Sequence, residues 1–439
     1  MKHTDFAPTP PMGWNSWDCY GAAVNEEQLL GNAEYMAKHL LKYGWDIVTC
    51  DIQWSEPNAH DTMYTSNAPL CMDEYSRLIP APNRFPSSAD GKGFLPISRK
   101  IHEMGLKFGI HIMRGIPRQA IYQRTKIKGT DLTADRVGDP FSVCGWNSDM
   151  YGVDPRSEGA QAYYDSLFEL YAEWEIDFIK VDDIAVTGVT SHEHHRRGDA
   201  MPGVAEIEMI HRAIMKCGRP IILSLSPGPA PIECAWMFRK NANMWRLTND
   251  VWDNWTAVEH MFERCETWQG RGGDGVWPDC DMLPFGHINC NNRLGDNYCR
   301  MTHDEQISMM NLWSIFRSPL IVGAELRDND EFTLELLTNE EILRLNKHSY
   351  DPNQIYRTRR AAAWYSHDDN SDGEGEHYIA LFNLRNEEST VTVKSSDIDE
   401  FDIRGRELRD LWAHKSAGVA GDVISVVLPA HGSVVYRVK

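Results

Sequence analysis

The sequence lacks several features that would assign it at once to a class of protein. Its ten cysteines lie singly at irregular spacings, and no two of them form a C-x-x-C pair. Residues 1–6 are polar and lack the apolar segment of a secretory signal. No run of about 18 apolar residues is present that could span a membrane. We therefore expect reduced cysteines, a cytoplasmic location and no membrane partner.

Positive charge is also scarce. The chain carries 44 Lys and Arg against 64 Asp and Glu, which gives a net charge of −20, and no basic stripe interrupts this acidity. Nucleic acids and anionic membranes attract basic surfaces, so nucleic acid is not an expected partner. The 439 residues, 42% of them hydrophobic, suffice for one large core and a second small domain.

From residue 10 to about 345, short β-like runs alternate with segments of helical periodicity. The β-like runs are 11–17, 46–54, 107–113, 178–184, 220–226, 244–250, 277–283 and 319–324. The helical segments between them are 26–43, 94–104, 159–174, 203–217, 256–268, 303–317 and 331–345. Eight strands alternating with helices predict a parallel sheet that closes into a (β/α)8 TIM barrel. An open doubly wound sheet is the alternative, but no G-x-G-x-x-G follows the first strand.

Residues from about 350 onward have a different pattern. The β-rich runs there are short and separated by turn signals: 361–365, 377–384, 389–393, 423–428 and 433–438. They predict an antiparallel β-sandwich of roughly 90 residues. We therefore divide the chain into a catalytic barrel, 1–347, and a C-terminal sandwich, 348–439.

Two predicted strands end in charged residues. Lys180 and Asp182 follow apolar residues in the fourth strand, and Arg246 and Asp250 lie in the sixth. An unpaired carboxylate buried in a core costs several kcal/mol, but the C-terminal ends of barrel strands open into the active site. Two carboxylates on two strand ends, each with a cationic neighbour, are suited to glycoside hydrolysis.

Four motifs resemble those of glycoside hydrolase family 27. They are Pro-Pro-Met-Gly-Trp-Asn-Ser-Trp at 10–17, Lys-Val-Asp at 180–182, Trp-Arg at 245–246 with Asp250, and Pro-Asp-Cys-Asp-Met-Leu at 278–283. They occur in the family's order, and the C-terminal sandwich fits the family as well. The resemblance implies a retaining enzyme that needs no cofactor or metal. The family's activities are α-galactosidase, α-N-acetylgalactosaminidase, isomalto-dextranase and β-L-arabinopyranosidase.

The resemblance also implies roles for the charged strand ends, with Asp182 as nucleophile and Asp250 as general acid/base. Retention requires an ionised carboxylate below the anomeric carbon and a protonated carboxyl beside the leaving oxygen, roughly 5–5.5 Å apart. Lys180, next to Asp182, is expected to keep that carboxylate charged. Arg246 is expected to bond a sugar hydroxyl or carboxylate.

Two further substrate contacts follow from the same resemblance. Trp17 matches the tryptophan that forms the floor of the sugar site, where its ring covers the apolar face of a pyranose. Asp281 matches a carboxylate that bonds ring hydroxyls near the nucleophile.

The second strand departs from the α-galactosidase pattern. α-Galactosidases have Asp-Asp-Cys-Trp where this chain has Asp51, Ile52, Gln53 and Trp54. Asp51 keeps the acid that holds the 4-hydroxyl region, but Ile52 cannot accept a hydrogen bond from the hydroxymethyl group. Burying that group against Ile52 costs roughly 1–3 kcal/mol, or about ten- to a hundredfold in selectivity. The expected sugar is therefore β-L-arabinopyranose, which has galactose's hydroxyl arrangement without the hydroxymethyl carbon.

Two other positions depart from the galactosidase pattern. His111 stands where the relatives place a tyrosine, and a core histidine is its alternative reading. Ser226 stands where galactosidases often have glutamate, and a serine there also occurs in α-N-acetylgalactosaminidases. The residues that complete an acetamido pocket are not recognisable at 228–230. We rank α-galactosidase as the second activity and α-N-acetylgalactosaminidase as the third.

The remaining signals concern loops. His192, His194 and His195 suggest a metal cluster, but they lack the i, i+4 spacing of H-E-x-x-H, so a solvated loop is favoured over the site rim or a metal-dependent enzyme. Insertions at 55–93 and 114–156 predict a narrow, covered pocket and also allow a homo-oligomer. The expected substrate is a small oligosaccharide or glycoside. An inactive carbohydrate-binding barrel is the non-enzyme alternative, and the two catalytic carboxylates argue against it.

Overall fold

The computed structural model describes residues 1–61, 64–184, 203–290, 295, 297–368, 375–399 and 401–439. An eight-stranded parallel sheet runs in the order β10-β9-β8-β7-β3-β2-β1-β13. Its strands are β1 (Met12–Asn15), β2 (Ile47–Cys50), β3 (Lys107–Met113), β7 (Phe178–Asp182), β8 (Ile222–Ser226), β9 (Met244–Arg246), β10 (Trp277–Asp279) and β13 (Leu320–Val322). Leu283, just beyond β10, forms a parallel bridge with Val322 and joins the two edges. The predicted TIM barrel is confirmed, with strands shorter than the apolar runs.

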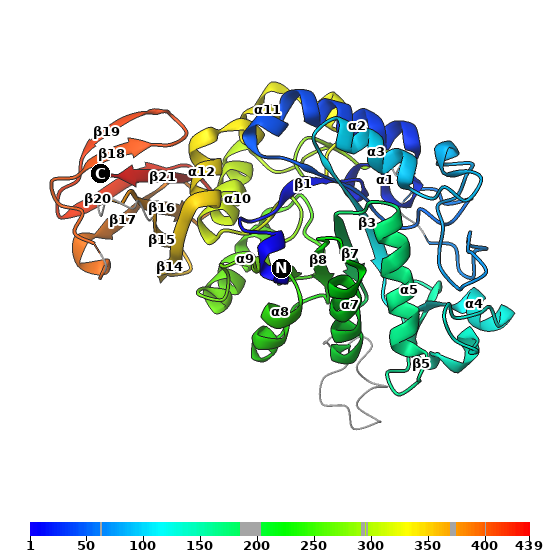
Figure 1. The fold of residues 1–439 in the computed structure, drawn as a ribbon. Helices are drawn as coiled ribbons and strands as arrows, with labels where there is room; N and C mark the ends of the chain where they lie inside the picture. Colours follow the sequence, from blue (N-terminus) through cyan, green and yellow to red (C-terminus); the bar gives the residue numbers. More distant parts are fainter. Residues whose placement is uncertain (62–63, 185–202, 291–294, 296, 369–374, 400) are drawn as a thin grey trace.

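The helices surround this sheet (Figure 1). They are α2 (Glu26–His39), α3 (Leu95–Glu103), α5 (Ala160–Glu173), α7 (Val204–Cys217), α8 (Ala235–Asn241), α9 (Trp255–Trp268), α10 (His303–Phe316), α11 (Glu331–Thr338) and α12 (Glu340–His348). The prediction of a single helix at 331–345 is wrong. The structure has two helices there because Asn339 is extended and its side chain accepts hydrogen bonds from the first N–H groups of α12.

The barrel interior is arranged in layers because alternate side chains of each strand point inward. The lowest layer is an apolar cluster that contains Ile47, Phe178, Ile222, Met244, Trp277 and Ile321. Two residues further along, the same face carries Thr49, Lys180, Ser224, Arg246 and Asp279. Two residues further again, it carries Asp51, Asp182, Ser226 and Asp281. Apolar burial at one end of the barrel thus supports charged residues at the other.

The insertion after β3 has structure of its own. It contains β4 (Ile116–Pro117), α4 (Arg118–Gln123), β5 (Gly138–Val143) and β6 (Met150–Val153), and the three strands form a small antiparallel sheet. A second small pair of strands, β11 (His287–Ile288) and β12 (Asn297–Tyr298), precedes α10.

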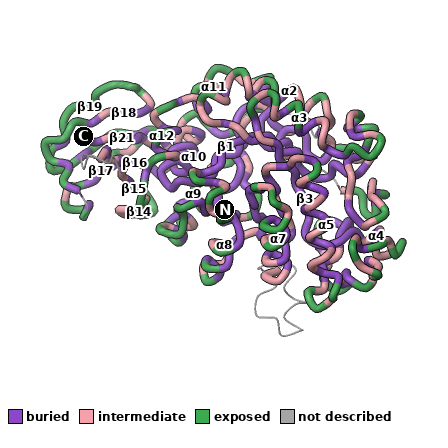
Figure 2. Tube along the Cα trace, in the orientation of Figure 1, coloured by how far each residue is buried: buried purple, intermediate pink, exposed green. Residues whose placement is uncertain are grey.

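The C-terminal part is antiparallel, and the predicted β-sandwich is confirmed. A six-stranded sheet has the order β14 (Ser349–Arg357), β15 (Ala361–Asp368), β16 (His377–Asn383), β21 (Ser433–Val438), β18 (Glu407–Asp410) and β19 (Lys415–Val419). It faces a pair formed by β17 (Ser389–Lys394) and β20 (Val423–Leu428). The sequence did not predict β14, β18 and β19. In β19 every residue is exposed, so it has no apolar alternation (Figure 2).

The sandwich packs directly on the barrel. Trp364 and Phe382 from the six-stranded sheet belong to the main hydrophobic cluster of the barrel. The Phe382 ring lies 5.0 Å from that of Phe262 on α9, in an edge-to-face arrangement. The predicted division between 347 and 348 stays a prediction, and the shared cluster shows that the two parts have a common core.

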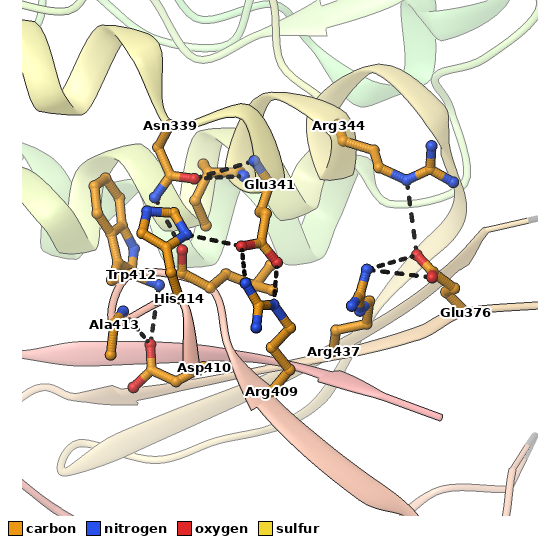
Figure 3. Close-up of polar contacts among 12 residues, drawn as sticks. Asn339, Glu341, Arg344, Glu376, Arg409, Asp410, Trp412, Ala413, His414 and Arg437 are labelled. Atoms are coloured by element: carbon orange, nitrogen blue, oxygen red, sulfur yellow. Dashed lines mark hydrogen bonds and ion pairs between the residues drawn. The ribbon is translucent and has the colours of Figure 1, made fainter. Parts of the chain in front are cut away.

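Polar contacts reinforce this junction (Figure 3). Glu341 on α12 accepts hydrogen bonds from Arg409 Nε at 2.7 Å and Nη2 at 2.8 Å, and His414 Nδ1 lies 2.7 Å from its Oε1. The Asn339 side chain donates to the carbonyl of Leu411 at 3.0 Å. The C-terminal sandwich therefore braces the last helix of the barrel. Across the described residues, no helix combines the length and apolar composition needed to cross a bilayer.

Candidate active site

A cavity of about 570 Å³ lies at the C-terminal ends of the barrel strands. Of the ten residues predicted from the sequence to form the site, all except His111 line it. The predicted lining residues are Trp17, Asp51, Ile52, Lys180, Asp182, Ser226, Arg246, Asp250 and Asp281. The barrel thus brings together strand ends that are more than 200 residues apart, as its eightfold topology requires.

Asp182 ends β7 and projects into this cavity. Its Oδ1 accepts a hydrogen bond from the backbone N–H of Asp183 at 2.8 Å, and its Oδ2 lies 3.2 Å from His111 Nε2. Burial opposes ionisation, but the His111 contact and the cations Lys180 and Arg246 outweigh it and lower the pKa of Asp182. His111 is 1% exposed and supports Asp182 from the side instead of forming part of the cavity wall. The carboxylate is therefore held ionised and oriented.

Lys180 pairs directly with Asp51 and not with its strand neighbour. Its Nζ lies 2.9 Å from Asp51 Oδ2, which also accepts a hydrogen bond from Asn15 Nδ2 at 2.7 Å. The backbone N–H of Ile52 donates to Asp51 Oδ1 at 2.8 Å. Burial favours the protonated acid, but Lys180, with His111 and Asn15, lowers the pKa of Asp51 to about 2. Lys180 also lowers the pKa of Asp182, through an attraction at longer range than its contact with Asp51.

Arg246 forms ion pairs with two carboxylates that line the cavity, those of Asp250 and Asp281. Its Nη1 lies 2.8 Å from Asp250 Oδ1, and its Nε lies 3.3 Å from Asp281 Oδ1. Asp281 also accepts a hydrogen bond from the backbone N–H of Val251 at 2.7 Å. The side chain of Asp250 is 61% exposed, so it stands at the mouth, whereas those of Arg246 and Asp281 are about 7% and 6% exposed. Burial, with the nearby Asp250, raises the pKa of Asp281 against the attraction of Arg246.

Ser226 and Asp183 complete the strand ends. Ser226 pairs in register with Asp182 on the adjacent strand, and its buried hydroxyl has no hydrogen-bond partner among the described residues. Asp183 is mostly buried and forms an ion pair with Arg114 at 3.0 Å. Burial raises the pKa of Asp183 to about 6, although Arg114 acts against this. Asp183 thus lines the cavity as one partner of a buried ion pair.

Sequence reasoning missed further residues that line the cavity, and three of them bear on its chemistry. Asp18 follows Trp17, and its Oδ2 is buried without a hydrogen-bond partner in the described part of the chain. Burial, with Asp281, raises the pKa of Asp18 well above its usual range. Tyr64 and Trp146 come from the insertions after β2 and β3. The length of these insertions predicted a cover for the pocket, but no periodic pattern identified which aromatic residues would reach it.

Three aromatic rings that line the cavity lie next to one another. The rings of Trp17 and Tyr64 are stacked, with centroids 5.9 Å apart and an interplanar angle of 14°. The Trp146 ring lies 5.4 Å from that of Tyr64 and is 41% exposed as a residue. The rings contribute an apolar surface to a cavity that charged groups also line.

The histidines at 192, 194 and 195 lie outside the described residues. Within the described ranges, no group of three or more His, Cys, Asp or Glu side chains is arranged to hold a metal ion.

Comparisons with known proteins agree with this architecture. A family model described as alpha galactosidase A matches residues 149–348, and one described as the alpha galactosidase C-terminal beta sandwich domain matches residues 368–438. A GH27 β-L-arabinopyranosidase from Geobacillus stearothermophilus is 51% identical, with a TM-score of 0.94 over 100% of this chain and 98% of that one. A variant of that enzyme has been crystallised in complex with arabinose.

Two further relatives carry other activities in their names. A proposed α-N-acetylgalactosaminidase from Bacillus halodurans C-125 is 49% identical, with a TM-score of 0.86 over 98% of this chain and 97% of that one. An α-galactosidase from Cyamopsis tetragonoloba is 24% identical over 99% of this chain and 87% of its own length.

Proposed function

This chain belongs to glycoside hydrolase family 27, and we propose that it is a retaining exo-enzyme that removes terminal β-L-arabinopyranosyl residues from small oligosaccharides or glycosides. The observation that carries this proposal is Ile52. It lines the cavity directly beside the ion-paired Asp51 and is 5% exposed. An alkyl side chain stands where a hydroxymethyl group would otherwise need a hydrogen-bond acceptor, and the arabinopyranosidase relative supports the same sugar.

In the first chemical step, Asp182 attacks the anomeric carbon while Asp250 gives its proton to the leaving oxygen. The bond from Asp182 to the anomeric carbon forms as the glycosidic bond breaks, so the product alcohol leaves with the proton. The lowered pKa of Asp182 supports its role as the ionised nucleophile. The exposure of Asp250 supports its role at the mouth, where leaving groups of different sizes must reach it.

In the second step, Asp250 takes a proton from water as the water oxygen attacks the anomeric carbon. The bond to Asp182 breaks, and its carboxylate returns to the ionised state that His111, Lys180 and Arg246 favour. These fixed charges need no rearrangement as negative charge leaves and returns to Asp182, which is how preorganised sites lower barriers.

The sugar ring would lie on Trp17, whose flat face covers apolar C–H surface. The ion pairs of Asp51 with Lys180 and of Asp281 with Arg246 present charged groups to the hydroxyls, which form the stronger class of hydrogen bond. We place the fifth ring carbon, which carries no substituent in arabinopyranose, against Ile52.

The proposal is tested by initial rates on p-nitrophenyl β-L-arabinopyranoside and p-nitrophenyl α-D-galactopyranoside under identical conditions. A higher kcat/KM for the arabinoside is expected. A higher kcat/KM for the galactoside would make the enzyme an α-galactosidase, in which Asp51 alone would bind the 4-hydroxyl region. If neither is turned over, p-nitrophenyl α-N-acetylgalactosaminide is assayed next, and its turnover would favour the third activity, with the small Ser226 making room for the acetamido group.

A further inference from the structure

Ile52 belongs to a small apolar cluster that is separate from the main core of the barrel. Its buried members are Ile52, Met113, Cys144 and Met150, and Tyr64 packs against them. Met113 ends β3, whereas Cys144 and Met150 come from the insertion after that strand. Only Ile52 and Tyr64 of these five residues line the cavity. We call this group the apolar wall.

Tyr64 occupies a central place in that wall. One face of its ring stacks on Trp17, the predicted floor of the sugar site. Burial, with the nearby carboxylates of Asp51, Asp182 and Asp250, raises the pKa of Tyr64, so its hydroxyl stays protonated. Tyr64 therefore lies between Trp17 and the cluster that contains Ile52, in the cavity that these carboxylates also line.

We propose that Tyr64 is a second specificity residue, and that its ring and Ile52 together close the space that a hydroxymethyl group on the fifth ring carbon would occupy. This inference rests on the proposed function. Two properties of the wall exclude that group. The ring takes up its volume, and the thioethers and thiol behind Ile52 offer its hydroxyl only weak acceptors. A hydroxyl buried there would lose its hydrogen bonds to water without replacement.

The wall also predicts how substitutions at position 52 behave. In Ile52→Asp, the new carboxylate would lie against Met113, Cys144 and Met150 while Tyr64 still filled the cavity. That single change is expected to raise the ratio of galactoside to arabinoside activity by less than the combination of Ile52→Asp with Tyr64→Ala, because only the combination supplies both an acceptor and space.

The test measures kcat/KM for both p-nitrophenyl glycosides in Tyr64→Ala and Tyr64→Phe. Tyr64→Ala should raise the galactoside-to-arabinoside ratio of kcat/KM about tenfold or more. One extra carbon in an apolar pocket usually changes discrimination by at least that factor. Tyr64→Phe keeps the ring and should leave the ratio within about twofold of the wild-type value, whatever it does to both rates together. Tyr122→Ala, at a tyrosine that is 90% exposed and outside the cavity, is the matched control.

An unchanged ratio in Tyr64→Ala, or equal shifts in the Ala and Phe variants, would overturn the proposal. Should Tyr64→Ala not fold, Tyr64→Leu removes the ring while retaining apolar packing and carries the same expectation. Binding of free L-arabinose and D-galactose, measured by calorimetry in Asp182→Ala with and without Tyr64→Ala, separates this inference from the proposed function. If the wild-type enzyme prefers the galactoside, the proposed function fails. The inference then stands only if removing the ring strengthens galactose binding.

Discussion

The ion pair between Lys180 and Asp51 gives a prediction with a defined magnitude. The two side chains are 12% and 2% exposed and 2.9 Å apart, so each would be a buried uncompensated charge without the other. Lys180→Met keeps the length of the side chain and removes its charge. Removing one partner of a buried pair costs about 3–5 kcal/mol. We expect the free energy of unfolding at pH 7 to fall by about that amount, in addition to a loss of activity.

The pH dependence distinguishes a lost charge pair from lost packing. In the wild type the pKa of Asp51 is about 2, below its ordinary value of 3.8. The stability that ionised Asp51 contributes is therefore present at pH 7 and is lost only as the pH falls from the ordinary value through the folded-state pKa. In Lys180→Met, burial is opposed only by the weaker effects of His111 and Asn15, so the pKa of Asp51 should rise. The folded variant then takes up a proton on acidification, and its deficit relative to the wild type should shrink by up to about 1.4 kcal/mol per pH unit.

Urea unfolding of both proteins at several pH values between 7 and 5 measures these differences. Lys107→Met is the control, since Lys107 pairs with Asp46 at 2.8 Å on the surface, where the side chains are 45% and 32% exposed. An exposed pair of this kind contributes about 0–1 kcal/mol. A Lys180→Met protein as stable as the control, or one whose deficit does not change with pH, would refute the electrostatic account.

Four further outcomes are expected. Asp182→Ala should abolish turnover of every glycoside, and normal rates would remove it from the nucleophile role. Asp250→Ala should slow substrates with poor leaving groups far more than p-nitrophenyl glycosides, which need little proton assistance; equal losses on both would contradict its role as the acid. Trp146→Ala, at the mouth, should raise KM for a disaccharide more than for a methyl glycoside, and equal effects would place the ring outside the leaving-group side. Glu341→Ala should lower the unfolding midpoint by removing the contacts to Arg409, with kcat unchanged in the folded enzyme.

The barrel was predictable because its strands and helices are buried on defined faces. Leu29, Ala33 and Met36 on α2 are buried as their spacing predicts. The strands that escaped prediction lie at sheet edges or carry exposed residues, as in β19, where packing does not constrain the sequence. The helix break at Asn339 escaped because an N-cap residue interrupts the backbone without interrupting the apolar pattern.

The site was predictable to the extent that it lies on strands. The ends of barrel strands must converge, so Asp182, Arg246 and Asp51 could be placed together before their contacts were known. The partner of Lys180 could not be read from the sequence, because a long side chain inside a barrel can pass its own neighbour and reach another strand. Tyr64 and Trp146 could not be placed either, since no repeating pattern fixes a residue in a long insertion.

The layout of the cavity separates two properties of the enzyme along the chain. The carboxylates and cations stand on or just after barrel strands, whereas most of the apolar wall and the ring at the mouth come from the insertions after β2 and β3. If Tyr64 selects the sugar as proposed, a change in these insertions will alter which sugar fits without altering the charged groups at the strand ends. The charged groups at the strand ends would then stay the same while the insertions after β2 and β3 differ. Exchanging these two insertions between relatives therefore offers a route to new sugar preferences.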